Sequence, residues 1–330
     1  MRAVVLDVYG DLDVLDVVEV ADPVPGPDEI LVDVVATALN RADLLQRRGL
    51  YPSPPLAGFV PPAPEIPGME FSGRVVGVGD RVSAWAIGDE VMGIVGGGAY
   101  AERLVVHEDQ AMRVPHGVSV ADAAAIPEVW ITAFDALVVQ GGLTSGRVAL
   151  VHAGASGGGT AAIQICRVIG ARVIVTASAG KLDACRSLGA DLAIDYATQD
   201  FVAECAAFTG GSGVDVVLDV IGGEYVDRNI AALRTGGRIV QVGMMGGGRT
   251  EVNIGMLLPK RASIVGTVLR SRSLAEKIAI SQRFATEVLP LFDAGLVRPV
   301  IDSRYPLSAI ADAQAHMERN ANIGKILIDI

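Results

Sequence analysis

The sequence predicts an α/β protein in which a β-rich domain is interrupted by a second domain built on a doubly wound parallel sheet. Three observations predict this class. Residues 1–120 are dominated by short β-like segments, strands alternate with helical stretches from Ala123 onwards, and the tail Gly324–Ile330 is strand-like again. Such alternation is typical of a parallel sheet covered by helices on both faces. We expect the tail to return to the first domain.

The first domain is expected to contain short strands separated by turns. The segment Asp22–Asp28 holds three prolines and a glycine, a composition typical of a turn. Residues 52–67 hold seven prolines and are expected to form a loop. The expected strands are Ala3–Val8, Asp13–Val20, Glu29–Ala38, Gly73–Val78, Glu90–Ile94 and Ala99–Val106.

The second domain is expected to contain six strands with helices between them. Residues 274–294, which follow the last strand, have the pattern of an amphipathic helix. We place the domain boundaries at 1–122 with 270–330, and at 123–269. The expected strands are Val148–His152, Arg172–Thr176, Asp191–Asp195, Val214–Val220, Arg238–Gly243 and Ser263–Leu269.

Residues 147–162 carry the clearest functional signal. An apolar run ends in a turn of small residues, the turn opens a helix expected from Thr160 to about Ile169, and a second apolar run follows. The glycines Gly157, Gly158 and Gly159 allow a pyrophosphate to approach the backbone, and the helix N-terminus favours its charge. In the register Ala153-x-x-Ser156-x-x-Gly159, Ser156 stands where glycine is more usual. The strand and helix on either side favour a nucleotide site over an ordinary tight turn.

Composition excludes several classes of partner. The formal net charge is −11 and no basic tract is present, so nucleic acids and anionic membranes are poor partners. No run is long and apolar enough to cross a bilayer. The chain starts directly with a strand-like segment, without the pattern of a signal peptide. Three widely separated cysteines are typical of buried thiols in a reducing compartment, so we expect a cytoplasmic protein.

Several segments together resemble the zinc-free quinone oxidoreductase branch of the medium-chain dehydrogenase/reductase superfamily. The resemblance spans nearly the whole chain, and it implies a GroES-like β-rich domain, a Rossmann domain and an active site in the cleft between them. Beside the turn described above, the segments are Ala38–Tyr51, Pro67–Gly73, Ala124–Phe134, Gly243–Gly248, Leu269–Arg272 and Asn322–Lys325.

The residues at the family's zinc positions predict a chain without metal. Zinc-dependent members carry a cysteine near Asn40 and a histidine one residue before a glutamate near Glu70, where this chain has Asn40 and Met69. An amide and a thioether do not replace thiolate and imidazole on zinc. His152 lies near the place of a third ligand, and we interpret it as a hydrogen-bonded histidine at a strand end. The chemistry that remains is hydride delivery to an electron-poor acceptor.

The residues after the second strand of the nucleotide domain favour NADPH over NADH. NAD enzymes carry a carboxylate about twenty residues after the glycine turn, but here no Asp or Glu occurs before Asp183. Ser178 and Lys181 suit a 2′-phosphate, and the resemblance adds Tyr196 at the adenosine end. Asp195 is a concern, because its charge would oppose the phosphate if it faced inward.

The resemblance also implies which residues surround the nicotinamide. Tyr51 and Asn40 are our candidate catalytic residues. The Tyr51 phenol is suited to donate a hydrogen bond to the acceptor oxygen, and the alternative is an aromatic residue of the cleft wall. Met244, Met245 and Trp130 are expected to be core or cleft wall rather than specificity determinants. The implied nicotinamide-binding residues are Asn40, Thr132, Gly243, Met244, Met245, Gly246, Leu269, Arg270, Ser271 and Asn322.

These observations predict an NADPH-dependent, zinc-independent quinone oxidoreductase. Reduction of an activated C=C bond in an enal, enone or enoyl thioester is the first alternative, and a low-turnover NADPH-binding structural or sensor protein is the second. The proline-rich loop, with Leu56 and Phe59, is expected to form part of the rim of the acceptor site, and the alternative is a surface loop without a role in substrate binding. Ser263–Leu269 is expected to be the edge strand of the parallel sheet, and two-fold pairing of that edge predicts a homodimer.

Overall fold

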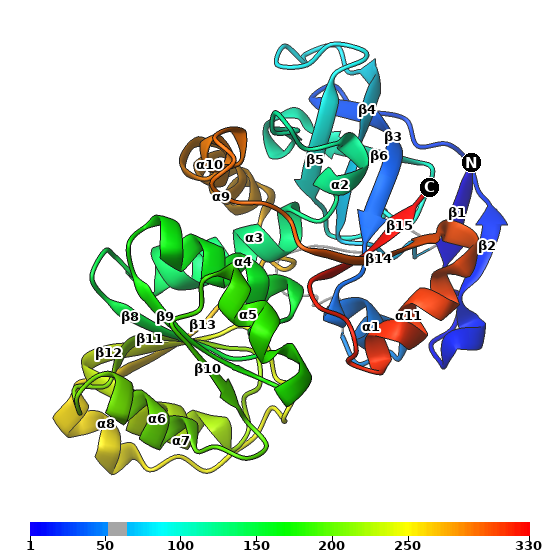
Figure 1. Cartoon of the computed structure of the whole chain (residues 1–330). Coiled ribbons are helices and arrows are strands. Elements are labelled where there is room, and N and C mark those ends of the chain that lie inside the picture. Colours follow the sequence, from blue (N-terminus) through cyan, green and yellow to red (C-terminus); the bar gives the residue numbers. More distant parts are fainter. Residues whose placement is uncertain (52–64) are drawn as a thin grey trace. The chain divides into compact units, whose positions relative to one another are not determined.

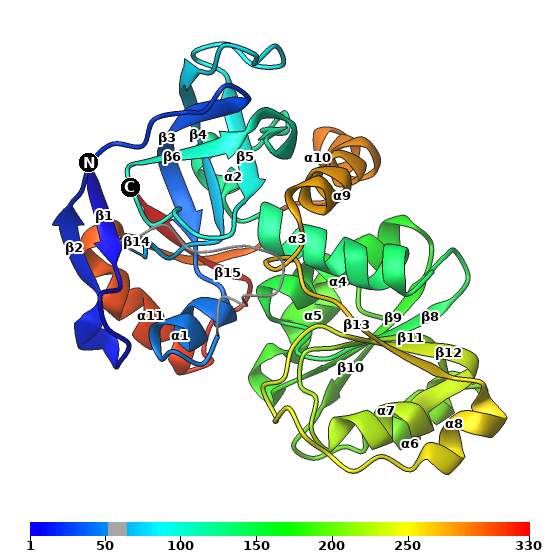
Figure 2. The same ribbon diagram turned by 180° about the vertical axis from the view of Figure 1, so that it is seen from behind.

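The computed structural model describes residues 1–51 and 65–330, and the chain divides into two compact units (Figure 1, Figure 2). Unit 1 comprises Met1–Ile131 with Leu269–Ile330, and unit 2 comprises Thr132–Val268. Leu56, Phe59 and most of the proline-rich loop lie outside the described residues.

Unit 1 is built on a largely antiparallel sheet. Its strand order is β14-β15-β3-β4-β5-β7, with β6 paired to β3. Burial alternates along the first part of β3, so that Ile30, Val32 and Val34 enter the core while their neighbours remain partly exposed. The strands are β3 (Glu29–Ala38), β4 (Glu70–Val78), β5 (Glu90–Ile94), β6 (Arg103–His107), β7 (Met112–Arg113), β14 (Ile301–Pro306) and β15 (Lys325–Asp329); β1 (Arg2–Val5) and β2 (Asp16–Glu19) form a separate antiparallel pair.

The C-terminal strand joins this first sheet. Leu327 of β15 lies opposite Ala38 of β3 in antiparallel register, which confirms the expectation that the tail returns to the β-rich part. The helices of unit 1 are α1 (Arg41–Arg47), α2 (Val120–Ala123), α9 (Leu274–Glu287), α10 (Leu289–Asp293) and α11 (Ile310–Glu318), while α3 (Pro127–Phe134) crosses the boundary between the units.

Unit 2 is a six-stranded sheet with the order β10-β9-β8-β11-β12-β13, and every neighbouring pair is parallel. This is the Rossmann order, in which the strand order reverses between β8 and β11. The predicted α/β class is therefore confirmed. The strands are β8 (Val148–Val151), β9 (Arg172–Ala177), β10 (Leu192–Asp195), β11 (Val214–Asp219), β12 (Leu233–Gln241) and β13 (Ser263–Gly266).

Helices cover both faces of the parallel sheet. In both views α4 and α5 lie on one face, and α6, α7 and α8 lie on the other (Figure 1, Figure 2). Strands that are buried on both faces read as continuous apolar runs, and all four residues of β8 are buried. The helices are α4 (Gly157–Val168), α5 (Leu182–Leu188), α6 (Phe201–Phe208), α7 (Tyr225–Ala232) and α8 (Ile254–Lys260).

Some sequence predictions of single elements are wrong. The expected strand Asp13–Val20 starts only at Asp16, because a 3-10 turn, Leu12–Val14, precedes it. The expected strand Ala99–Val106 starts only at Arg103. The expected helix 274–294 is broken at Val288, just before Pro290, whose ring cannot continue the hydrogen-bond ladder.

Within residues 1–51 and 65–330, no helix is long and apolar enough to span a bilayer.

Candidate functional site

The turn between β8 and α4 is held by a serine cap. Ser156 has an extended backbone (φ −69°, ψ 168°), and its Oγ accepts the Gly159 N–H at 3.1 Å. The cap starts α4 at Gly157, three residues before the predicted start at Thr160. Sequence reasoning assigned Ser156 to the phosphate contact and missed this capping role.

The glycines of the turn differ in what surrounds them. A Cβ on Gly159 would overlap the carbonyl oxygens of Ala153 and Gly154, whereas a Cβ on Gly158 would meet nothing within 4 Å. Ala153 has a φ of +56°, a conformation that few residues other than glycine adopt. Gly159 is therefore required by packing of the turn, while Gly158 faces open space.

This turn fits a pyrophosphate. Gly157 and Gly158 are the first two residues of α4, so their N–H groups have no acceptor within the helix. With the positive end of the helix dipole, such groups favour an anion. The open space beside Gly158 leaves room for that anion to approach.

The candidate adenosine residues lie at the carboxyl edge of the same sheet. Asp195 pairs with Ala177 in the parallel register of β10 and β9, so Tyr196 and Ser178 both follow directly at that edge. Tyr196 is 53% exposed. Lys181 is half-buried at the end of the 3-10 turn that begins after Ser178.

The nearby carboxylates are engaged elsewhere. Asp195 accepts the Ala197 N–H at 3.1 Å and the Thr198 hydroxyl at 2.8 Å, so its carboxylate caps the turn after β10. Asp183 lies on α5 with an exposed side chain, and its Oδ1 is 2.7 Å from the Arg186 guanidinium. The Asp195 carboxylate is therefore bound by neutral donors of its own turn, which stabilise its negative charge.

His152 belongs to a buried polar network at the strand ends of unit 2. Its Nδ1 lies 2.9 Å from Thr176 Oγ1, and its Nε2 lies 2.8 Å from Asn229 Oδ1. Asn229 Nδ2 donates to Asp219, so Asn229 Oδ1 accepts and His152 carries its proton on Nε2. Burial lowers the pKa of His152, which keeps the ring neutral. The interpretation of His152 as a hydrogen-bonded histidine is confirmed.

The same network supports two loops. Asp219 Oδ1 accepts the N–H groups of Ile221 and Gly222 at 2.6 and 3.0 Å. The Gly223 N–H in turn donates to the Gly247 carbonyl, and the Gly246 N–H donates to the Ile221 carbonyl. The loop 243–248 is therefore fixed through its backbone.

The methionines of this loop are not core residues. Met244 and Met245 are 66% and 50% exposed, which rules out the core for both. Trp130, by contrast, is 2% exposed and packs edge-on against Phe292.

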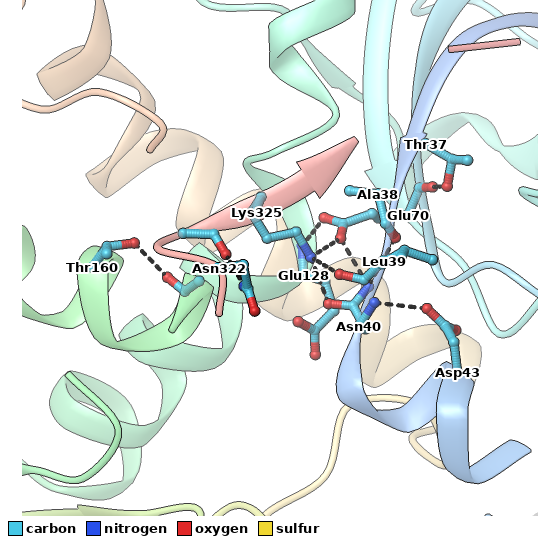
Figure 3. A network of polar contacts seen from close by, with 12 residues as sticks. Thr37, Ala38, Leu39, Asn40, Asp43, Glu70, Glu128, Thr160, Asn322 and Lys325 are labelled. Atoms are coloured by element: carbon cyan, nitrogen blue, oxygen red, sulfur yellow. Dashed lines mark hydrogen bonds and ion pairs between the residues drawn. The ribbon is translucent and has the colours of Figure 1, made fainter. Parts of the chain in front are cut away.

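In unit 1, Asn40 lies in a second buried network (Figure 3). Its Nδ2 donates to Glu70 Oε1 at 2.8 Å and to Ala38 O at 3.3 Å. Its Oδ1 accepts from Lys325 Nζ at 2.7 Å. Both amide protons are thus used, so the Asn40 side chain has no proton left to donate.

Asp43 extends this network and was missed by sequence reasoning. Its Oδ2 accepts the Asn40 N–H and the Tyr100 hydroxyl, each at 2.7 Å, while its buried Oδ1 has no partner. Burial raises the pKa of Asp43 to about 6, above its ordinary 3.8. An acidic residue three positions after a helix cap was the signal that could have identified it.

Tyr51 lies beside a cation. The Arg270 guanidinium is 5.2 Å from the centre of the Tyr51 ring, and Arg270 Nε donates to the Gly96 carbonyl at 2.9 Å. Burial raises the pKa of Tyr51, so the phenol stays protonated through neutral pH. A protonated phenol is able to donate a hydrogen bond.

The remaining candidate residues are distributed over both units. Asn322 is 9% exposed, and its Nδ2 donates to the Gly324 carbonyl at 2.8 Å. Unit 1 contains Asn40, Tyr51, Leu269, Arg270, Ser271 and Asn322, while unit 2 contains Thr132, Ser156, Gly157, Gly158, Gly159, Ser178, Lys181, Tyr196, Gly243, Met244, Met245 and Gly246.

The donor set at the zinc positions of the family does not fit zinc. Glu70 is fully buried; its Oε1 accepts from Lys325 and Asn40, and its Oε2 accepts the Glu128 N–H. Met69 offers only a buried thioether. Zinc prefers thiolate, imidazole and carboxylate ligands, and the one carboxylate present is already paired with an ammonium group. Among the described residues, no three His, Cys, Asp or Glu side chains are grouped to hold a metal.

Two family descriptions match the chain. Residues 26–116 match the alcohol dehydrogenase GroES-like domain, and residues 157–286 match the zinc-binding dehydrogenase family. The synaptic vesicle membrane protein VAT-1 homolog of Rattus norvegicus is 34% identical, over 99% of this chain and 84% of that protein.

Solved structures share the whole fold. A quinone oxidoreductase of Pseudomonas syringae pv. Tomato DC3000 has a TM-score of 0.89 at 29% identity, covering 100% of this chain and 99% of the other. The JamJ enoyl reductase has a TM-score of 0.88 at 26% identity, covering 99% and 98%. With the Rossmann strand order and the residues at the zinc positions, these matches show that the chain belongs to the medium-chain dehydrogenase/reductase superfamily of oxidoreductases, consistent with its zinc-free branch.

Proposed function

We propose that the chain is an NADPH-dependent, zinc-independent quinone oxidoreductase. The observation that carries the proposal is the pairing of Glu70 with Lys325 and Asn40, which leaves no ligand set for a Lewis acid at these positions. Activation of an alcohol as an alkoxide needs such a group, whereas an electron-poor quinone accepts hydride without it. Two solved structures of similar fold carry the name quinone oxidoreductase.

In this proposal, bound NADPH supplies the hydride from C4 of its nicotinamide. The N–H groups of Gly157 and Gly158 hold the pyrophosphate, and Ser178, Lys181 and Tyr196 hold the 2′-phosphate. Asn40 accepts a hydrogen bond from the cofactor. These contacts supply positioning, which is the main contribution that a protein makes to hydride transfer.

Replacing Lys181 by alanine tests the cofactor assignment. Loss of a charge-assisted hydrogen bond should weaken NADPH binding by about 1–3 kcal/mol and leave NADH binding unchanged. Fluorescence titration of both cofactors measures this, with Lys181→Arg as the control that keeps the charge. Equal affinities of the unmodified protein for NADH and NADPH would contradict the assignment.

Replacing Tyr51 by phenylalanine tests the proposed donor. Because burial keeps the phenol protonated, removing it should lower the turnover of quinone about tenfold, the effect of one lost hydrogen bond of about 1.4 kcal/mol. NADPH affinity should not change. Full quinone turnover in Tyr51→Phe would instead support the alternative that Tyr51 is an aromatic residue of the substrate site wall.

Reduction of an activated C=C bond is the second candidate function. The observation that favours it is the similarity to solved enoyl reductases. The same cofactor and the same neutral phenol serve both reactions, so acceptor specificity separates them. A low-turnover NADPH-binding protein is the third candidate, supported by the relatives named as vesicle membrane proteins.

The proposal includes a homodimer. β13 ends the strand order of the parallel sheet, and Ile264 and Val268 near this edge are 42% and 45% exposed. Two-fold pairing of such an edge covers it symmetrically. Light scattering in dilute solution should give two copies of the 34.2 kDa chain, and Ile264→Lys should shift the mass towards one copy. A monomeric unmodified protein would contradict the dimer.

A cytoplasmic location is also part of the proposal. Cys166, Cys185 and Cys205 are unpaired and buried, and burial raises the pKa of each thiol. Unpaired thiols are typical of proteins in a reducing compartment. Recovery of the native protein in the membrane fraction of its cell, and not in the cytosol, would contradict this location.

A further inference from the structure

Lys325 is a cation buried at the start of a core strand. Its side chain is 3% exposed, and the three residues after it are the buried Ile326, Leu327 and Ile328. A lysine is rarely buried unless all three of its protons are bound. Here Nζ donates to Leu39 O at 2.6 Å, to Asn40 Oδ1 at 2.7 Å and to Glu70 Oε1 at 2.7 Å.

Both oxygens of the Glu70 carboxylate, the partner of Lys325, accept hydrogen bonds. Glu70 Oε1 accepts from Asn40 Nδ2 as well as from Lys325, and Glu70 Oε2 accepts the Glu128 N–H at 2.8 Å. The Lys325 ammonium and the Glu70 carboxylate therefore form a buried ion pair, and the Asp43 carboxyl belongs to the same network. Asn40 lies between them and touches both (Figure 3).

These two charges fix the orientation of the Asn40 amide. Its oxygen faces the ammonium group and its NH2 faces the carboxylate. The flipped amide would place NH2 against the ammonium of Lys325 and oxygen against the carboxylate of Glu70, which are both repulsive. The Asp43 N–H donates to the Asn40 backbone carbonyl at 3.0 Å, and Asn40 and Asp43 also form a capping box at the start of α1. Both amide protons of Asn40 are bound, so a contact of this side chain with a further group is made through Oδ1.

We propose that Lys325 is a positioning residue: with Glu70 it locks the Asn40 amide so that Oδ1 is presented as an acceptor to the cofactor. This rests on the proposed NADPH function. The ammonium group lies among the residues at the family's zinc positions and supplies an internal positive charge there. Lys325 does not act as a proton donor, because all three protons are bound.

Removing both charges separates positioning from folding. In Lys325→Met with Glu70→Gln both members of the buried ion pair are removed together, so the fold should persist. The Glu128 N–H still requires an oxygen acceptor from position 70, which turns the NH2 group of the new amide towards Asn40 and favours the flipped Asn40 amide. NADPH affinity should then fall at least tenfold, the effect of one lost hydrogen bond.

A double-mutant comparison shows whether Lys325 acts through Asn40. Asn40→Ala alone should weaken NADPH binding to a similar extent. Adding Asn40→Ala to the Lys325→Met/Glu70→Gln variant should change the NADPH affinity less than twofold. Arg74→Met with Glu90→Gln removes an exposed pair at 2.7 Å on β4 and β5 and should leave the affinity unchanged. Wild-type NADPH affinity in the Lys325→Met/Glu70→Gln variant would overturn the proposal. So would losses of affinity that add when Asn40→Ala is combined with that variant.

A second measurement needs no cofactor. In the protein labelled with 15N-asparagine, the side-chain NH2 signal of Asn40, assigned by its absence in Asn40→Ala, should show slow exchange with solvent. Fast exchange of that signal would overturn the locked amide. Slow exchange in a protein that binds no NADPH would instead reject the proposed function and retain the locked amide.

Discussion

Alanine at Gly159 should destabilise the protein by about 1–3 kcal/mol, while alanine at the adjacent Gly158 should leave stability unchanged or raise it slightly. A methyl group at Gly159 would overlap two backbone carbonyl oxygens that have little freedom to move, whereas one at Gly158 meets no atom within 4 Å. Gly158 also lies in α4, where alanine is favoured by about 0.5–1 kcal/mol. Chemical denaturation of the two variants measures the difference.

The same pair tests the phosphate site. The open space beside Gly158 is the space that a pyrophosphate needs, so Gly158→Ala should weaken NADPH binding at least tenfold in a fully stable protein. Wild-type NADPH affinity in Gly158→Ala would show that the phosphate does not bind at the start of α4. Equal stability of the two variants would show that the packing of Gly159 is not what requires glycine.

Replacing Asp43 by asparagine should change how stability depends on pH. The folded pKa of Asp43, about 6, is above its ordinary 3.8, so the folded state binds this proton more tightly than the unfolded state does. The stability that this proton contributes is fully present below the unfolded pKa and is lost as pH rises through the folded pKa. A shift of about two units corresponds to about 3 kcal/mol.

The difference between wild type and Asp43→Asn isolates this effect, because other titrating groups cancel. Wild type should lose about 2–3 kcal/mol relative to the variant as pH rises from about 4 to about 7. Tyr100→Phe is a useful companion, since it removes one of the two donors to Asp43 and leaves the carboxyl in place. A difference that does not vary with pH would show that Asp43 titrates near its ordinary value when folded.

Local sequence patterns predicted the fold and the turn between β8 and α4. The apolar runs of unit 2 and the small residues at 153–159 specify strand, turn and helix within a short stretch of chain. The helix start was missed by three residues because the glycine run was not taken as helical, whereas the Ser156 cap begins the helix there.

The buried polar networks were not predictable from such patterns. Lys325 and Glu70 are 255 residues apart in the chain, and His152 and Asn229 are 77 residues apart. The sequence around one partner does not indicate which residue it contacts. The lysine just before the apolar residues Ile326–Ile328 was the visible signal, since such a charge requires a buried partner. The hydrogen bonds of the Asp195 carboxylate with the Ala197 N–H and the Thr198 hydroxyl likewise became visible only in the structure.

Initial rates of NADPH oxidation by the unmodified protein, with an ortho-quinone and with an enal as acceptors, test the proposed function. We expect quinone-dependent oxidation that is faster with NADPH than with NADH, faster than with the enal, and unchanged by a metal chelator. Turnover with the enal alone would identify the chain as a reductase of activated C=C bonds. Tight NADPH binding without turnover of either acceptor would contradict an enzymatic role.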